Sequence, residues 1–369
     1  YGGNSFEQKK PDPAGVRALL SEANVPSHLA LMVGDSAVDI RTARNAGIPC
    51  CGVTYGFQPE SLETEPPDFL VDRFEDVTRL VIEGKRKDSA HYTRGLLRKI
   101  EDSGGKSPHP EDFFRMMASN FCVPGFGKVD IVSYREAEHI ELEMENVYSI
   151  PMAQGQAAGV FEAVLDCRGD VSWEGDATRG RVTVSVREGE PELEKRIESE
   201  VESTEDLLDR GEMEYELCRG CSAPRDLCRE FDWSVERAMI TERRSGRRFI
   251  FDNTRGITAV MRILVEELGE EVERSLLEIS RGYARDYYLG IDGGLDVDAE
   301  FARLSLWGWG LPTRLDGSNG DHRLEIVNPF YGPVMAGRVW GLVEAASGKA
   351  FDLAEHVSGD NLVLLGLAS

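Results

Sequence analysis

The sequence lacks any apolar run long enough to cross a membrane. No stretch approaches the roughly 18 consecutive apolar residues that predict a transmembrane helix, and no signal peptide opens the chain. Basic residues are also scarce, since 42 Lys and Arg stand against 66 Asp and Glu, for a net charge of −24. This negative charge repels the phosphate backbone of nucleic acids. We therefore predict neither a membrane nor a nucleic-acid partner.

Cysteine is sparse and irregularly placed. The chain has seven cysteines in 369 residues, without the even spacing of a disulfide framework. This usage favours a reducing compartment and predicts a cytoplasmic protein. Apolar residues make up 41% and charged residues 29% of the chain, which is typical of soluble globular proteins, and the length is enough for two or three domains.

The first stretch with a chemical pattern lies near the start of the chain. An apolar run over 29–33 ends just before Asp35, as a buried parallel strand does when it delivers a polar group to its carboxyl end. Asp39 follows at the start of a predicted helix over 37–46. Carboxylate oxygens at such a strand end suit Mg²⁺. Upstream, Lys10 has the charge to neutralise a transferring phosphoryl group.

Residues 1–83 resemble the C-terminal part of the haloacid dehalogenase-like (HAD-like) hydrolases, and among them the phosphoglycolate phosphatases most closely. The resemblance runs through two motifs and four flanking segments: Lys10-Pro11-Asp12-Pro13, Gly34-Asp35-Ser36, 1–6, 39–40, 46–47 and 52–56. It implies an incomplete, Rossmann-like α/β domain with further strands at 48–54 and 68–71. It also implies that Lys10 binds phosphate, that Asp35 is a Mg²⁺ ligand, and that Asp39 supports the metal site. The residues alone leave open a solvated lysine and a helix-capping aspartate.

One part of the HAD-like pattern is missing. No D-x-D-x-[TV] segment occurs in the sequence, so the aspartate nucleophile and general acid of that family are absent, and covalent phosphoryl transfer needs such a nucleophile. The chain also opens on Tyr1, where the family would be most of the way through its domain. We therefore expect a truncated product of a longer gene, inactive alone, with an open sheet edge where the nucleophile strand belongs.

The remainder of the chain carries an internal repeat. Residues 142–163 align without gaps to 324–345, and eight of the 22 pairs are identical. Further upstream, Gly125-Phe126-Gly127 corresponds to Gly308-Trp309-Gly310, and Thr93-Arg94-Gly95 is aligned with Ser280-Arg281-Gly282. We define copy 1 as residues 88–190 and copy 2 as residues 241–369, joined by an acidic linker with a cysteine cluster, 191–240.

Each copy is predicted to be an α+β module. In copy 2, apolar residues with helical spacing over 260–288 predict a helix before the Gly-aromatic-Gly turn. In copy 1, a strand over 139–144 alternates with a period of two. The predicted buried face of that strand holds Ile140, Leu142 and Met144. A G-x-x-x-G helix follows in each copy, and its glycines share one face, which permits close backbone packing.

These elements resemble the 4-vinyl reductase domain, a small-molecule-binding module also found in the sensing regions of bacterial aromatic-responsive regulators. The features that carry the resemblance are the Gly-aromatic-Gly turn, the strand that leads into Asn146 or Asn328, the G-x-x-x-G helix, and Glu174 or Glu355 before the last hairpin. The resemblance implies an apolar or aromatic small-molecule ligand. Candidate pocket residues are Phe126, Tyr148, Phe161, Trp309, Phe330 and Trp340; the alternative is that they are simply core.

A zinc site is a second hypothesis. In metal-binding members of the 4-vinyl reductase family, a cysteine precedes the glycine helix and a C-x-x-C loop interrupts the last hairpin. Here Ile150 and Gly332 stand where that cysteine would be, and neither hairpin has the C-x-x-C loop. A zinc site within either copy is therefore not expected. Three thiols cluster in the linker, near Glu216, and are either zinc ligands or reduced loop cysteines: Cys218, Cys221 and Cys228.

Two functions are compatible with this sequence. The first is a Mg²⁺-dependent phosphomonoester hydrolase of the phosphoglycolate phosphatase type, acting on a small phosphorylated substrate, with the repeats as regulatory or dimer-forming domains. The second is a non-enzymatic small-molecule sensor or interaction protein that carries a phosphatase remnant. An upstream D-x-D-x-[TV] segment would distinguish them.

Overall fold

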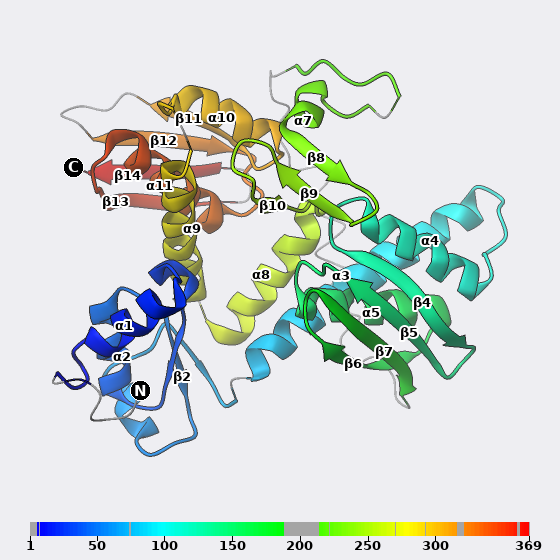
Figure 1. Cartoon of the computed structure of the whole chain (residues 1–369), viewed down its shortest axis with the longest axis horizontal. Coiled ribbons are helices and arrows are strands. Elements are labelled where there is room, and N and C mark those ends of the chain that lie inside the picture. Colours follow the sequence, from blue (N-terminus) through cyan, green and yellow to red (C-terminus); the bar gives the residue numbers. More distant parts are fainter. Residues whose placement is uncertain are drawn as a thin grey trace. The chain divides into compact units, whose positions relative to one another are not determined.

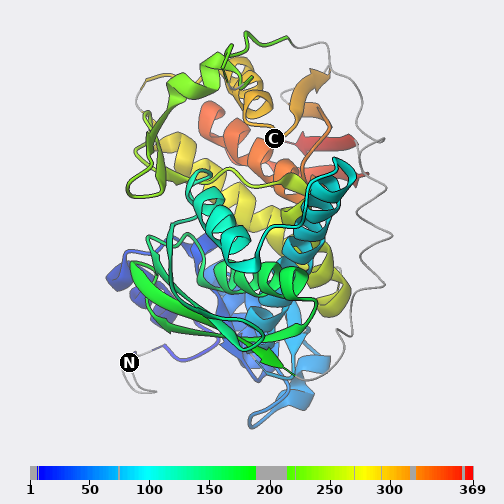
Figure 2. The same cartoon turned by 90° about the vertical axis from the view of Figure 1, so that its right-hand side faces the viewer.

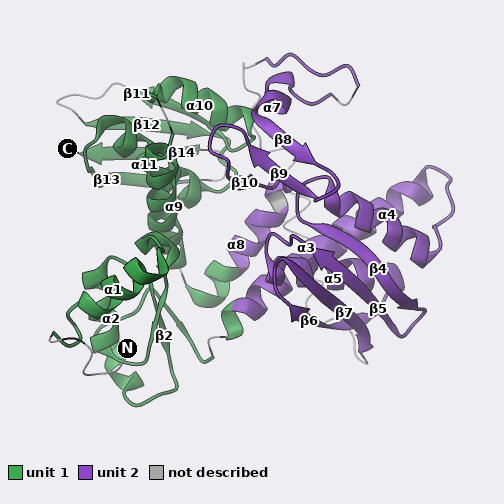
Figure 3. Ribbon diagram, in the orientation of Figure 1, with its two compact units in different colours: residues 1–77, 208–211, 264–369 green, residues 78–207, 212–263 purple. Residues whose placement is uncertain are grey.

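The computed structural model describes nearly all of the chain outside the acidic linker. The described residues are 6, 8–73, 75–187, 214–220, 222–269, 271–291, 293–315, 321–359 and 362–368, without the side chain of residue 255. The chain divides into two compact units (Figure 3). One comprises 1–77, 208–211 and 264–369, and the other 78–207 and 212–263. Among the described residues, no helix has the length and apolar content that crossing a bilayer requires.

The first 77 residues contain a small parallel α/β structure. Its elements are α1 (Ala14–Ala23), β1 (Met32–Gly34), α2 (Ala37–Ala46), β2 (Cys50–Val53) and β3 (Phe69–Val71), with 3-10 turns η1 (Ser27–Leu29) and η2 (Pro59–Glu63). The strands form a parallel sheet in the order β1-β2-β3. The predicted strands and the predicted 37–46 helix are therefore present, and α2 ends at Gly47 in the left-handed conformation, with φ of 70°.

Strand β1 lies at one edge of this sheet. In the described part of the chain its only strand neighbour is β2. Two apolar side chains at this edge, Leu31 and Val33, are 40% and 41% exposed, although an apolar residue of a parallel strand is ordinarily buried. Among the described residues β1 is therefore an open edge of the sheet, as expected.

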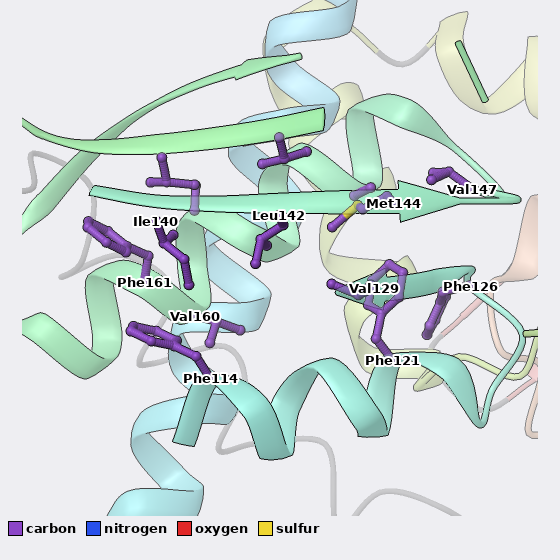
Figure 4. Packing of buried hydrophobic residues seen from close by; sticks show 14 of the residues in the cluster. Phe114, Phe121, Phe126, Val129, Ile140, Leu142, Met144, Val147, Val160 and Phe161 are labelled. Carbon is purple, nitrogen blue, oxygen red and sulfur yellow. The ribbon is translucent and has the colours of Figure 1, made fainter. Parts of the chain in front are cut away.

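Copy 1 is an α+β structure with an antiparallel sheet. Its elements are α3 (Glu75–Asp102), α4 (Pro110–Cys122), β4 (Lys128–Arg135), β5 (His139–Glu145), α5 (Ile150–Leu165), β6 (Arg168–Gly175) and β7 (Arg179–Arg187), with strand order β4-β5-β7-β6. The buried face of β5 is the predicted one, with Ile140, Leu142 and Met144 at 2%, 8% and 2% exposure. These side chains meet aromatic residues of α4 and α5 in one hydrophobic core (Figure 4).

The part of copy 2 from residue 271 on has the same element order. It consists of α9 (Glu271–Leu289), α10 (Val297–Leu306), β11 (Leu311–Leu315), β12 (His322–Val327), α11 (Gly332–Ser347), β13 (Asp352–Ser358) and β14 (Leu362–Ala368). Residues 241–263 belong to the unit that contains copy 1, so the repeated structure begins later than predicted. Its strand order, β11-β12-β14-β13, matches that of copy 1 element by element. Figures 1 and 2 show α11 alongside α9. The duplication read from the sequence is thus a duplication of structure.

The glycine helices fix the register between the two copies. A Cβ at Gly159 would overlap the carbonyl oxygen of Arg86, and a Cβ at Gly341 would overlap that of Arg281. Arg86 and Arg281 are therefore the equivalent arginines. The sequence alignment of Arg94 with Arg281 is therefore wrong by about two helical turns. Helix α3 is continuous, and its repeating pattern gives similar alignments at more than one register.

The Gly-aromatic-Gly turns adopt one conformation. Both glycines of each turn have positive φ, 87° and 140° at Gly125 and Gly127 and 76° and 124° at Gly308 and Gly310. A β-carbon at Gly127 or Gly310 would lie only 2.9 or 3.0 Å from a backbone oxygen. The turns therefore require glycine at these places, which explains their recurrence.

Two stretches differ from prediction. The helix expected over 260–288 is broken into α8 (Thr254–Leu268) and α9, because Gly269 takes φ of 95°. The region expected to be linker up to residue 240 is folded from residue 217 on: it contains α7 (Arg225–Glu230) and an antiparallel sheet, β8 (Phe231–Ser234), β9 (Met239–Glu242) and β10 (Arg248–Phe249). The acidic stretch 188–213 lies outside the described residues.

Candidate functional site

Lys10 and Asp39 meet at the carboxyl end of β1. The Lys10 Nζ donates a hydrogen bond of 2.7 Å to Asp39 Oδ1, and the Ser36 hydroxyl donates one of 2.6 Å to Asp39 Oδ2. The Asn45 side chain donates to the carbonyl oxygen of Pro11 at 2.8 Å, which ties the Lys10 loop to the end of α2. Lys10 and Asp39, which are 29 positions apart in the sequence, therefore lie in one cluster.

The charge state of Asp39 follows from these contacts. Burial alone raises the pKa of the carboxyl, but the hydrogen bonds from Lys10 and Ser36, the Lys10 charge and a backbone hydrogen bond outweigh it and leave the pKa below its ordinary value. Its side chain is 11% exposed, whereas that of Lys10 is 56% exposed. Asp39 is therefore ionised, and it holds the lysine ammonium at the edge of solvent.

Asp35 lies beside this pair, at the end of the same strand. Its Oδ2 accepts a hydrogen bond of 2.5 Å from the backbone N–H of Phe57. A Cβ at Gly56, which has φ of 142°, would overlap the Asp35 carboxylate, and a Cβ at Gly34 would overlap Asp39. Both glycines are required for the loop and strand to approach the two carboxylates this closely.

The two carboxylates predicted to serve a Mg²⁺ site differ in how far they are engaged by hydrogen bonds within the chain. Both oxygens of Asp39 are occupied by hydrogen bonds within the chain, and one oxygen of Asp35 is as well. Within the described ranges, no three His, Cys, Asp or Glu side chains come together as a metal site. Mg²⁺ takes six oxygen ligands and keeps several waters. Asp35 fits one such position, and these residues do not complete the site alone.

Copy 1 contains an apolar cavity of about 50 Å³. Helix α4, the buried face of the sheet and α5 line it (Figure 4). Its lining is Phe114, Met117, Ala118, Phe121, Val129, Ile140, Leu142, Met144, Gln156, Ala157, Val160 and Phe161. Gln156 is the one polar residue in this lining. Cavities of this composition take apolar ligands with few polar contacts.

Only one of the six predicted pocket residues, Phe161, lines this cavity. Phe126 is buried in the same core, in contact with Phe121 at a ring distance of 5.3 Å. Tyr148 is 48% exposed, with the guanidinium of Arg248 5.5 Å from its ring.

In copy 2 the remaining predicted aromatics are packed near arginines. Trp309 stands edge-on to Phe330, with a ring distance of 5.2 Å, and the guanidinium of Arg338 lies 3.9 Å from the Trp309 ring. Trp340 is 3% exposed, with Arg281 at 3.8 Å. The predicted set is therefore a mixture of core residues and residues beside arginine guanidinium groups, of which that of Arg338 is buried.

Of the cysteine cluster, Cys218 is partly buried and Cys228 is exposed, while Cys221 lies outside the described residues. The zinc hypothesis stays a prediction.

Sequence reasoning missed two buried charge clusters. Lys85, 3% exposed, lies 3.1 Å from Asp88 and 3.0 Å from Asp252. Glu162 accepts hydrogen bonds from the backbone of Gly169 at 2.8 Å and lies 3.5 Å from Arg86.

Glu344 is the equivalent of Glu162 in copy 2. It accepts a hydrogen bond of 3.0 Å from the backbone N–H of Phe351 and lies 2.6 Å from the Arg281 guanidinium. Burial raises the pKa of Glu162, against the opposing effect of the Gly169 hydrogen bond and the Arg86 charge. The sequence did contain a signal for this cluster, because the pair Glu162 and Glu344 is one of the eight identities in the repeat.

Comparison with known families supports the reading of the first part of the chain. Residues 8–77 match a family model described as HAD-hydrolase-like. Phosphoglycolate phosphatases are similar over the same region: that of Rhodospirillum rubrum is 49% identical over 59 residues, 16% of this chain and 24% of the relative. That of Vibrio parahaemolyticus is 38% identical over 81 residues, 22% of this chain and 36% of the relative. The chain thus spans about a quarter to a half of the length of the curated relatives it matches.

One solved structure is similar to part of this chain. It is the crystal structure of the phenol-responsive sensory domain of the transcription activator PoxR with phenol, at 14% identity and a TM-score of 0.31, covering 39% of this chain and 87% of that chain. A similarity of this size does not establish a shared fold.

Proposed function

We propose that residues 8–77 are the phosphate-binding and metal-binding half of a Mg²⁺-dependent phosphomonoester hydrolase of the phosphoglycolate phosphatase type. The observation that carries this proposal is the 2.7 Å contact between Lys10 and Asp39 beside Asp35, at the end of a parallel strand. The family match over the same residues supports it.

Each residue has a distinct role in this proposal. Lys10 binds the phosphoryl oxygens and neutralises their charge during transfer. Asp39 has both oxygens engaged and orients Lys10. Asp35, with one oxygen engaged, is the residue that would hold Mg²⁺, which when bound supplies further positive charge at the phosphate.

The nucleophile must come from another segment, because the chain contains no D-x-D-x-[TV] sequence. The exposed edge of β1 is the place for a strand that carries it, since the carboxyl ends of neighbouring parallel strands meet at one edge of a sheet. Such a strand would also cover Leu31 and Val33. The described chain alone is expected to be inactive.

A fusion tests this proposal. The segment of the Rhodospirillum rubrum phosphatase that precedes the matched region is joined ahead of residue 8, and hydrolysis of 2-phosphoglycolate is measured with and without Mg²⁺. We expect Mg²⁺-dependent turnover that falls about 100-fold or more in Lys10→Ala and Asp35→Asn.

Two matched variants serve as controls for the fusion. Lys9→Ala removes the neighbouring lysine, and Asp68→Asn alters a carboxylate at the opposite end of the sheet that bonds the backbone of Cys50. Both should keep turnover. Full activity in Asp35→Asn would show that this aspartate is not a metal ligand, and a folded but inactive fusion would favour the alternative of a phosphatase remnant.

A second function is favoured by the cavity of copy 1. We infer that this copy binds a small, neutral, apolar or aromatic molecule, in a sensing or regulatory role. A cavity of about 150 Å³ is known to bind benzene, so the 50 Å³ seen here must enlarge to take a ring. Toluene or phenol should raise the melting temperature, and Val160→Trp, which fills the cavity, should abolish the rise.

A further inference from the structure

Arg338 is a buried cation in copy 2. It belongs to α11, is 5% exposed, and its Nε makes no hydrogen bond. Its guanidinium lies 3.9 Å from the ring of Trp309 and 5.6 and 5.9 Å from the rings of Tyr287 and Tyr283. The side chain is thus surrounded by aromatic rings rather than by carboxylates.

Other buried arginines differ in this respect. Among the described residues, Arg86 and Arg248 also bury an Nε without a hydrogen bond. Arg86, however, lies 3.3 Å from Glu83 and 3.5 Å from Glu162, and Arg248 donates to the backbone oxygens of residues 125 and 146. Arg338 has neither an ion pair nor a hydrogen bond within the part of the chain that the structure describes.

An unpaired arginine is costly to bury. The guanidinium stays charged at any ordinary pH, so it cannot escape the cost of desolvation by losing its proton. Stacking on aromatic rings recovers only part of this cost. A bound anion would recover more, through two parallel hydrogen bonds from the planar fork.

The repeat identifies the corresponding position in copy 1. Gly337 and Gly341 flank Arg338 as Gly155 and Gly159 flank Gln156, so residues 338 and 156 share one face of equivalent helices. Gln156 is the polar residue of the copy 1 cavity. A neutral amide that lines the cavity of copy 1 is therefore replaced by a cation at the equivalent position of copy 2.

We propose that copy 2 binds a small aromatic carboxylate, with Arg338 as its counter-ion, and that position 156 or 338 decides whether a copy takes a neutral or an anionic ligand. Beyond Trp309, which contacts the arginine, two further rings extend this apolar surface: Trp307 and Phe330 lie 6.4 and 5.2 Å from the Trp309 ring. The inference extends the ligand-binding role proposed above but uses a different site and probe.

Benzoate is the probe, with benzyl alcohol as its neutral counterpart and acetate as the anion without a ring. Binding to the full chain is measured by calorimetry and by the shift in melting temperature. We expect benzoate to bind and to raise the melting temperature, with benzyl alcohol and acetate binding about tenfold or more weakly. Arg338→Gln should weaken benzoate by the same factor, while Arg179→Gln, an exposed arginine of copy 1, should not.

The variants separate a binding role from a structural one. Arg338→Gln introduces the residue that copy 1 already carries, and without ligand its melting temperature should not fall. A lower melting temperature together with no benzoate effect in the original chain would show that Arg338 is a structural cation, and would overturn the proposal. Equal binding of benzoate and benzyl alcohol by the original chain would overturn it without any variant. The proposed ligand binding by copy 1 is tested separately. It stands, whatever the benzoate result, if phenol raises the melting temperature and Val160→Trp abolishes that rise.

Discussion

Gly159 of α5 lies so close to Arg86 of α3 that a methyl group on the glycine would overlap the Arg86 carbonyl oxygen. The same relationship joins Gly341 to Arg281 in copy 2. Both helix pairs therefore pack backbone against backbone, and the conserved spacing of the two glycines in each copy follows from this contact.

Gly159→Ala should destabilise copy 1. The added methyl must separate two helices, and overpacking of this kind costs about 1–3 kcal/mol. Gly95→Ala is the matched control, because Gly95 also lies in a helix but has open space around it. There, alanine should be neutral or stabilise by up to about 1 kcal/mol. Urea unfolding measures both changes, and equal effects would contradict the packing described.

Glu344→Gln should be more damaging than Glu278→Gln, although both acids contact Arg281. The Glu344 side chain is 1% exposed and lies 2.6 Å from the arginine, whereas that of Glu278 is 50% exposed and 3.4 Å away. Removing the charge of the buried partner leaves Arg281 with only the exposed Glu278, and because Arg281 itself reaches solvent we expect a cost of about 2–3 kcal/mol, less than for a fully buried pair. The exposed pair is expected to contribute less than about 1 kcal/mol. Chemical denaturation of the two variants decides this.

The ion pair of Lys10 and Asp39 predicts a loss of stability in acid. Because the folded pKa of Asp39 lies below its ordinary value, its contribution is present above about pH 4 and is lost as the pH falls through the folded pKa. The lysine is more than half exposed, so the change is expected to stay below about 1 kcal/mol. Asp39→Asn should remove this part of the difference in unfolding free energy between pH 6 and pH 3. A variant with the same pH dependence as the original chain would contradict the assignment.

Thiol labelling should distinguish buried from exposed cysteines. Burial raises the pKa of Cys50 to about 12 and that of Cys51 to about 11, and only the thiolate is reactive. At pH 8, Cys228 on α7 should be labelled in the folded protein, while Cys50 and Cys51 should react only after unfolding. Peptide mass spectrometry locates the label, and rapid native labelling of Cys50 would be inconsistent with strand β2.

Local patterns predicted much of the fold. The apolar run before Asp35, the helix that ends at Gly47 and the alternating strand with Ile140 and Leu142 all appear where expected. In each, the signal is confined to a few neighbouring residues and is set by backbone geometry or by burial on one face. The repeat was equally visible, since its identities include the two glycines that the packing requires.

What the sequence did not reveal depends on distant contacts. The pairing of Arg86 with Arg281 needs the three-dimensional contact with the glycine helix, because a continuous helix gives no landmark for alignment. Among the aromatic residues, nothing local distinguishes Phe161, which lines the cavity, from Phe126, which does not. Burial of Arg338 was missed because a lone arginine in a sequence is ordinarily read as exposed.

The close glycine contact of α5 also determines how copy 1 can exchange a ligand. Since α5 has no side-chain spacer against α3, a small shift of α5 would break backbone contact, whereas α4 faces the cavity through side chains such as Met117 and Phe121. Met117 is unbranched and adapts its shape readily. Entry and release should therefore be limited by excursions of α4, and amide hydrogen exchange would slow in α4 on ligand binding while that of α5 hardly changes.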